Sequence, residues 1–179
     1  QAEAGERVPS ERGPVPVISL YGGQKEPAPG ELAAMDLFVV DLPDVGSRYY
    51  TYMATMLDAL RACARAGVPV LVLDRPNPLG GDVIEGPVAA GPFSPVCYAP
   101  IPIRHGMTPG ELAHFARKTR LVDPALKLDI ALLDGWRPAL LFEQCSLPWV
   151  APSPNMPTAE TALLYAGTCL FEGVNVNEG

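Results

Sequence analysis

Apolar positions follow two spacings between residues 37 and 74. Residues 37–40 form a short continuous apolar run, which is typical of a strand covered on both faces of a sheet. Residues 68–73 form a second, β-branched run. Strand, helix, strand predicts a βαβ unit with parallel strands and a right-handed crossover. Between the runs the apolar spacing is helical up to a stop at Gly67, and the predicted buried stripe is Tyr49, Met53, Met56, Leu57, Leu60 and Ala64.

Carboxylates follow both predicted strands. Asp41 and Asp44 come after the first run, and Asp74 ends the second. The carboxyl ends of parallel strands meet at one edge of the sheet, where open α/β sheets bind ligands. A single aspartate after a strand is more often a helix cap or turn former. The three together favour a binding site at this edge.

The rest of the chain alternates short elements with long loops rich in proline and glycine. We expect an extended loop over residues 1–14, and long structured loops over residues 75–87 and 147–157. Thr108, Pro109 and Glu111 form a capping box at the start of a helix. The other predicted elements are a strand over residues 15–21, a helical turn over 27–34, a strand over 128–133 and a helix capped by Thr158 and ending near Leu170.

Composition narrows the class of protein. Hydrophobic residues make up 48% of the 179 residues and charged residues 18%, as in a globular domain with a full core. The net charge of −7 disfavours nucleic acid and anionic membranes as partners. No apolar run is long enough for a membrane span. The cysteines have no metal-ligand spacing, and Cys63 and Cys169 lie in apolar helical patterns, so we predict reduced, buried thiols and no metal.

Several side chains could carry chemistry at the predicted edge. Paired carboxylates are what glycoside hydrolysis needs, and Glu85, Glu172 and Glu178 also lie on loops after apolar runs. Arg48 could form a structural ion pair or bind a substrate carboxylate. His105 could be an acid/base or a hydrogen-bond donor to sugar hydroxyls. An aromatic wall for a sugar ring could come from Tyr49, Tyr50, Tyr52, Trp136 and Trp149.

Common cofactor and hydrolase motifs are missing. The sequence has no GxGxxG after a strand, no GxxxxGK[ST] and no GxSxG. We therefore predict no nucleotide cofactor and no α/β-hydrolase nucleophile.

Successive blocks of the sequence, in order, resemble the exo-β-N-acetylmuramidases of the NamZ type, long known as the domain of unknown function DUF1343. The blocks are Asp41-x-x-Asp-Val-Gly-x-Arg-Tyr-Tyr-Thr-Tyr52, Asp74-Arg-Pro-Asn-Pro78, Glu85-Gly-Pro-Val88, Ile101-Pro-Ile-Arg-His-Gly-Met-Thr-x-Gly-Glu-Leu-Ala113, Pro152-Ser-Pro-Asn-Met-Pro-Thr158, Gly167-Thr-Cys-Leu-Phe-Glu-Gly173 and Glu178-Gly179. Pro43 departs from the pattern, because the family usually has glutamine there.

The resemblance implies an α/β fold, a Rossmann-like parallel sheet flanked by helices, followed in the family by a smaller second domain. Residues 1–179 would be a partial N-terminal domain. The family's Pro-Glu-His-Gly block, whose glutamate is a candidate acid/base, would lie upstream, and the second domain downstream. The implied parent is a secreted or periplasmic protein.

The implied activity is hydrolysis of terminal β-linked N-acetylmuramic acid from peptidoglycan saccharides such as MurNAc-GlcNAc. Retaining, inverting and substrate-assisted mechanisms all stay open. The alternative is a non-catalytic muropeptide-binding domain. Expected catalytic residues are Asp44, Glu172 and His105, and expected substrate-binding residues are Asp41, Arg48, Tyr50, Asp74, Arg104, Asn155 and Glu178, with Arg48 or Arg104 pairing with the lactyl carboxylate.

Overall fold

A three-stranded parallel sheet in the order β3-β4-β5 lies at the centre of the molecule. The structure, a computed structural model, describes residues 7–10, 13–20 and 24–171. The strands are β3 (Phe38–Val40), β4 (Val70–Leu73) and β5 (Leu128–Ala131). β3 and β4 run parallel and flank helix α2 in sequence, so the predicted βαβ unit is confirmed, and with it the α/β class.

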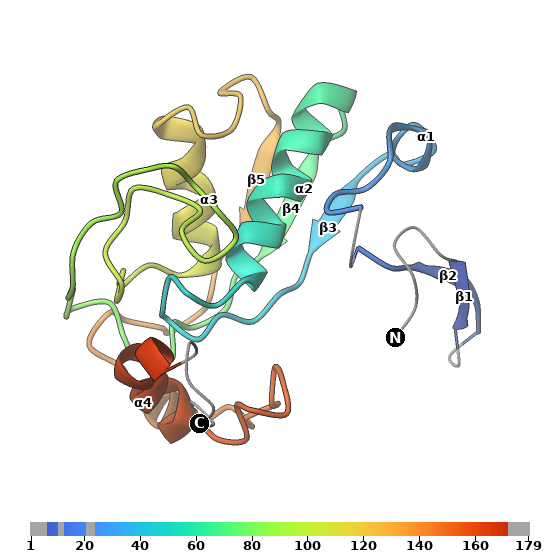
Figure 1. Ribbon diagram of the computed structural model, residues 1–179. Coiled ribbons are helices and arrows are strands. Elements are labelled where there is room, and N and C mark those ends of the chain that lie inside the picture. Colours follow the sequence, from blue (N-terminus) through green and yellow to red (C-terminus); the bar gives the residue numbers. More distant parts are fainter. Residues whose placement is uncertain (1–6, 11–12, 21–23, 172–179) are drawn as a thin grey trace.

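Two helices cover one face of this sheet. They are α2 (Tyr52–Ala66) and α3 (Pro109–Lys118), which lie beside each other in Figure 1. Alternate strand residues such as Val40, Val70 and Val72 pack with the apolar sides of both helices in one core cluster. This burial of apolar area is the main stabilising contribution to the fold.

The other face of the sheet is open within the described residues. Val39 is 48% exposed, and Asp129, which lies two strands away on β5 in the same row across Leu71, is exposed as well. The expectation that the strand over residues 37–40 is covered on both faces is therefore wrong for the part of the chain described. A continuous apolar run does not tell whether a second layer packs against it.

Helix α2 begins three residues later than its apolar spacing predicts. Tyr49 lies before the helix and is only partly buried, so it does not belong to the buried stripe, whereas Met53, Met56, Leu57 and Leu60 do. The backbone before the helix bonds to another loop instead of continuing the helix, because Arg48 N donates to Ile103 O at 2.8 Å. At the other end Gly67 has φ of 71°, the left-handed conformation expected of a helix stop.

The capping signals of the last two long helices are confirmed. Thr108 Oγ1 accepts from Glu111 N at 3.1 Å, and the Glu111 side chain accepts from Thr108 N through Oε2 at 2.9 Å. Thr158 Oγ1 accepts from Thr161 N at the start of α4 (Ala159–Thr168). Short 3₁₀ helices occupy Phe142–Cys145 and Cys169–Phe171. In Figure 1, α4 lies beyond the carboxyl ends of the strands.

The N-terminal elements form a separate antiparallel pair. β1 (Arg7–Ser10) pairs with β2 (Gly13–Ile18), followed by the expected helical turn, α1 (Pro29–Leu32). The expectation of a loop throughout residues 1–14 is therefore wrong over β1. Strand pairing uses backbone groups, so a polar segment without apolar alternation can complete a two-stranded ladder.

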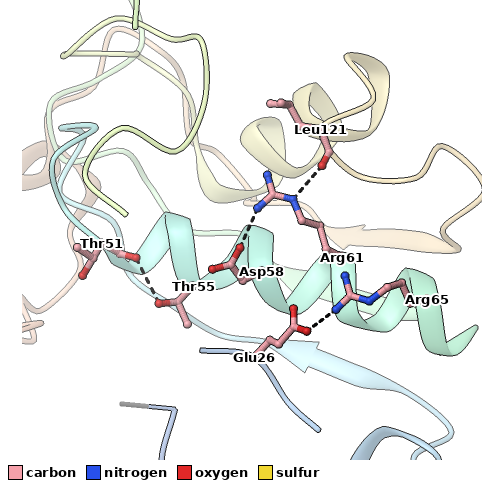
Figure 2. A network of polar contacts seen from close by, with 7 residues as sticks. All are labelled: Glu26, Thr51, Thr55, Asp58, Arg61, Arg65 and Leu121. Atoms are coloured by element: carbon pink, nitrogen blue, oxygen red, sulfur yellow. Dashed lines mark hydrogen bonds and ion pairs between the residues drawn. The ribbon is translucent and has the colours of Figure 1, made fainter. Parts of the chain in front are cut away.

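Polar contacts fix the exposed side of α2 to its neighbours (Figure 2). Arg61 donates to Asp58 Oδ1 at 2.8 Å and to the Leu121 carbonyl at 3.0 Å, which ties α2 to the segment after α3. Arg65 pairs with Glu26 before α1. These partly exposed pairs orient the helix more than they stabilise it. None of the helices in the described part is both long and apolar enough to cross a membrane.

All four cysteines are free thiols, and Cys63 and Cys169 are buried, as predicted for these two. Burial raises the pKa of Cys63 from its ordinary value of 9.0 to about 11. The neutral thiol therefore stabilises the fold below about pH 9, and this contribution is lost as the pH rises towards about 11.

Gly110 of α3 is a position where a side chain does not fit. An added Cβ would lie 2.7 Å from Ile130 Cγ2 and 2.9 Å from Asp74 Cγ. We expect Gly110→Ala to lower the free energy of unfolding by about 1–3 kcal/mol in urea titrations. Gly167→Ala in α4 is the matched control: its Cβ meets nothing within 4 Å, so it should raise stability by about 0.5–1 kcal/mol. Equal effects of the two changes would contradict this packing.

Thiol alkylation checks the placement of the cysteines. In native protein at pH 8 we expect iodoacetamide to modify Cys97 and Cys145, which are partly exposed, before Cys63 and Cys169. In urea all four should react at similar rates. Peptide mass spectrometry identifies the modified positions, and early native labelling of Cys63 would refute the burial described.

Candidate active site

Three loops meet at the carboxyl edge of the sheet. Arg104 forms isolated backbone bridges with both Ser47 and Glu85, so the loops after β3, after β4 and before α3 are joined at one point. The contact is close, because a Cβ on Gly81 would lie 2.8 Å from the Gly106 carbonyl oxygen. At Gly81 the neighbouring backbone therefore leaves no space for a side chain.

Asp74 attaches the end of β4 to the start of α3. Its Oδ2 accepts from Thr108 Oγ1 at 3.0 Å, and its Oδ1 accepts from Gly110 N at 2.8 Å. A carboxylate at this position also interacts favourably with the helix dipole. Asp74 thus has the helix-capping role that is common for aspartates after strands, and its predicted role in substrate binding stays a prediction.

Asp41 is at the same edge, at the end of the neighbouring strand β3. Its Oδ1 accepts from Arg75 Nε at 2.7 Å and lies 2.6 Å from Arg75 Nη2. Both side chains are about half exposed. The prediction that Asp41, Asp44 and Asp74 share the carboxyl edge of a parallel sheet is confirmed for Asp41 and Asp74, which follow two paired strands.

Asp44 and His105 form a buried pair. Asp44 Oδ2 lies 3.2 Å from His105 Nε2, and neither side chain is exposed. The distance is that of an ion pair, but the two groups are not aligned as a hydrogen bond. His105 Nδ1 accepts from Met107 N at 3.2 Å, so in the neutral ring the hydrogen is on Nε2, facing Asp44. We expected Arg104 and His105 to point into the same cleft as Asp44. His105 does lie beside Asp44, but neither His105 nor Arg104 lines the cavity described below.

Two buried phenols, those of Tyr98 and Tyr50, lie near enough to Asp44 to feel its charge. Burial raises the pKa of Tyr98 well above its ordinary value, and the charge of Asp44 adds to the shift while Arg48 opposes it. Burial likewise raises the pKa of Tyr50. Both phenols therefore stay protonated at neutral pH. The Tyr98 hydroxyl has no hydrogen-bond partner in the described part of the chain, whereas the Tyr50 hydroxyl lies near the side chains of Tyr52 and Ser153 without a well-aligned hydrogen bond. They are potential donors beside a carboxylate.

The two arginines expected to bind a substrate carboxylate contact the protein instead. Arg48 is 5% exposed, and its Nη1 donates to Ile101 O at 2.6 Å. Arg104 Nη1 pairs with Glu85 at 3.1 Å, and its Nη2 donates to the Leu79 carbonyl. Both side chains thereby hold the three loops together. Their binding of substrate stays a prediction.

A cavity of about 520 Å³ opens between this edge and the loop before α4. Asp44, Arg75 and Pro76 line one side, and Tyr52 and Trp149 are among the aromatic residues of its wall. Trp149 is held by a bond from Nε1 to Met156 O and by an edge-to-face contact with Phe142, at 4.9 Å between ring centroids. Fixed aromatic faces beside a carboxylate and a guanidinium suit a sugar ring with a polar substituent.

The other predicted residues are only partly brought together. Tyr50 packs against Tyr52, with ring centroids 4.7 Å apart, but does not line the cavity. Asn155 is exposed. Glu172 and Glu178 lie outside the described residues. Of the expected aromatic wall, Tyr52 and Trp149 line the cavity, whereas Trp136 lines an adjacent one that shares Pro76 and Leu147.

Three residues near the cavity or Asp44 were not expected from the sequence, namely Arg75, Phe142 and Tyr98. Arg75 could have been found, because it directly follows Asp74 at the predicted edge. Tyr98 comes from a loop and Phe142 from a four-residue 3₁₀ helix, both too short or irregular for a periodic apolar pattern, so no local signal marked them. Over residues 7–10, 13–20 and 24–171, no cluster of three or more His, Cys, Asp or Glu side chains is arranged to hold a metal ion.

Comparisons with known proteins find relatives of this chain. The sequence profile of the family described as "Exo-beta-N-acetylmuramidase NamZ, N-terminal" matches residues 1–160. "Peptidoglycan beta-N-acetylmuramidase NamZ" of Bacillus subtilis (strain 168) is 44% identical over 182 residues, which cover 99% of this chain and 44% of that protein. The chain thus spans less than half the length of this relative.

Two crystal structures of DUF1343 family proteins from Bacteroides fragilis NCTC 9343 have the same fold. One has a TM-score of 0.82 at 35% identity, covering 87% of this chain and 41% of its own. The other has a TM-score of 0.78 at 36% identity, covering 89% and 43%. The matches in sequence and structure run over nearly the whole chain, and the chain therefore belongs to the NamZ family of exo-β-N-acetylmuramidases, through the family's N-terminal region.

Proposed function

We propose that the full-length protein containing this chain is a glycoside hydrolase that releases terminal β-linked N-acetylmuramic acid from peptidoglycan fragments. The observation that carries the proposal is the buried Asp44–His105 pair at a cavity with aromatic walls, in a chain that belongs to the NamZ family. Such a cavity can hold one sugar ring next to the residue that bears this carboxylate, and glycosidases act through carboxylates near the ring.

Asp44 is the proposed catalytic carboxylate within the described residues. Asp41 and Asp74 are engaged by Arg75 and by the start of α3, whereas neither carboxylate oxygen of Asp44 accepts a well-aligned hydrogen bond. His105 orients Asp44 and offers it the Nε2 hydrogen. Because Nδ1 is used by Met107 N, His105 has no second nitrogen available for proton transfer. We assign it a positioning role, with Glu172 as the proposed second carboxylate.

The proposed substrate also suggests where the protein acts. Peptidoglycan lies outside the cytoplasmic membrane, so we propose that the full-length protein is secreted or periplasmic. Fractionation of the source cells, with the protein detected by antibody, tests this proposal.

The activity is tested with the full-length protein and two aryl glycosides. We expect release of the chromophore from an aryl β-N-acetylmuraminide and much slower release from the matching N-acetylglucosaminide. A site with a charged group for the lactyl carboxylate discriminates strongly against a ligand that leaves this group unpaired. Equal turnover of both would indicate a generic glycosidase, and binding without turnover would indicate a muropeptide-binding protein.

Asp44→Asn tests the role of the buried carboxylate. In the full-length protein we expect kcat to fall about 10²- to 10⁴-fold, because the amide can neither accept nor supply the proton of a general acid/base. Asp129→Asn is the matched control, since Asp129 is exposed on the open face of the sheet. It should leave kcat unchanged. Full activity of Asp44→Asn in steady-state assays would remove Asp44 from the catalytic site.

A further inference from the structure

Arg75 is the cation of the cavity. Among the described residues that line the cavity, it is the one with a positive side chain, whereas Arg48 and Arg104 do not line it. The backbone holds Arg75 in place, because Asp74 Oδ1 accepts from Arg75 N at 3.1 Å and the next residue, Pro76, is buried. Its guanidinium therefore starts from a fixed point at the carboxyl edge of the sheet.

Asp41 uses only one edge of that guanidinium. It contacts Nε and Nη2, both through the same oxygen, Oδ1. A guanidinium has five N–H donors, so two hydrogens on Nη1 and one on Nη2 remain. No hydrogen bond or ion pair of Nη1 occurs within the described residues. The remaining hydrogens form the end-on fork that binds a carboxylate through two parallel bonds.

The Asp41–Arg75 pair is too exposed to serve mainly as a stabilising contact. The two side chains are 49% and 46% exposed, and ion pairs of this kind contribute little to folding stability. Holding the long arginine side chain in one conformation, however, removes part of the entropy cost of binding a ligand. Asp41 is thus a positioning residue for the Arg75 fork.

The substrate in the proposed function differs from N-acetylglucosamine by one charged group, the carboxylate of the lactyl ether. We propose that Arg75 binds this lactyl carboxylate end-on and is the residue that distinguishes N-acetylmuramic acid from N-acetylglucosamine. The inference rests on the proposed function for the identity of the sugar. It replaces Arg48 and Arg104, the arginines first expected in this role, with one that faces the cavity.

The test measures binding, so that it is independent of turnover. Isothermal titration of the full-length protein with N-acetylmuramic acid, its methyl ester and N-acetylglucosamine compares a charged, a masked and an absent carboxylate. We expect the wild type to bind N-acetylmuramic acid roughly 10- to 100-fold more tightly than the other two, as for a charge-assisted bidentate contact. In Arg75→Gln all three affinities should become similar, and Arg75→Lys should lie between.

Arg61→Gln is the matched control. Arg61 also pairs with an aspartate, Asp58, and is 32% exposed, but it lies on α2 away from the cavity lining. It should keep the wild-type preference. Thermal unfolding of Arg75→Gln should match the wild type, which separates loss of the fork from loss of the fold.

The possible results of the titrations distinguish failure of the inference from failure of the proposed function. A preference for the free carboxylate that survives in Arg75→Gln overturns the inference, and so does a wild type with no preference, including no measurable binding of any of the three. A loss of affinity in Arg75→Gln that is equal for acid and ester also overturns it, because that would indicate a structural role. Preferential binding that depends on Arg75 without hydrolysis of the aryl muraminide would contradict only the proposed function.

Discussion

The geometry of the site depends on the attachment of α3 to the sheet by the Asp74 carboxylate. Two donors from the first turn of α3 bind its oxygens at 3.0 and 2.8 Å, and this contact leaves no room for a side chain at Gly110. His105 is three residues before the capping Thr108. The attachment of the helix therefore also sets the distance between the imidazole and Asp44, which comes from a different loop. A capping interaction, modest in energy, thus determines where the buried pair forms.

The surroundings of Asp44 are costly for folding. Asp44 Oδ1 and the hydroxyls of Ser47 and Tyr98 are buried without hydrogen-bond partners in the described part of the chain, whereas most buried polar atoms in proteins have one. Each such atom costs about 1–3 kcal/mol. The apolar core beneath the sheet compensates for this cost. Buried polar atoms without partners that lie around one carboxylate, beside a cavity, are typical of a site that binds a polar ligand.

Much of the framework follows from local sequence signals. The capping box at Thr108, the stop at Gly67 and the parallel strands around α2 were all predictable, because each depends on residues close in sequence. The start of α2, the exposed face of β3 and the partners of Arg48 were not. These features depend on backbone and side-chain contacts between loops far apart in the chain, such as Arg48 N with Ile103 O, and no spacing rule contains them.

The three aspartates on the segments that follow β3 and β4 have three different environments, and their partners explain the difference. Asp74 faces the first turn of a helix, so its oxygens accept hydrogen bonds from a backbone N–H and a hydroxyl. Asp41 faces an exposed guanidinium, so it orients a cation at the cavity. Asp44 alone of the three is buried beside an imidazole and protonated phenols. Of the three, Asp44 is the carboxylate whose oxygens accept no well-aligned hydrogen bond within the described residues. Position in the chain therefore brings these aspartates to one region of the sheet, whereas the local partners set the environment of each carboxylate.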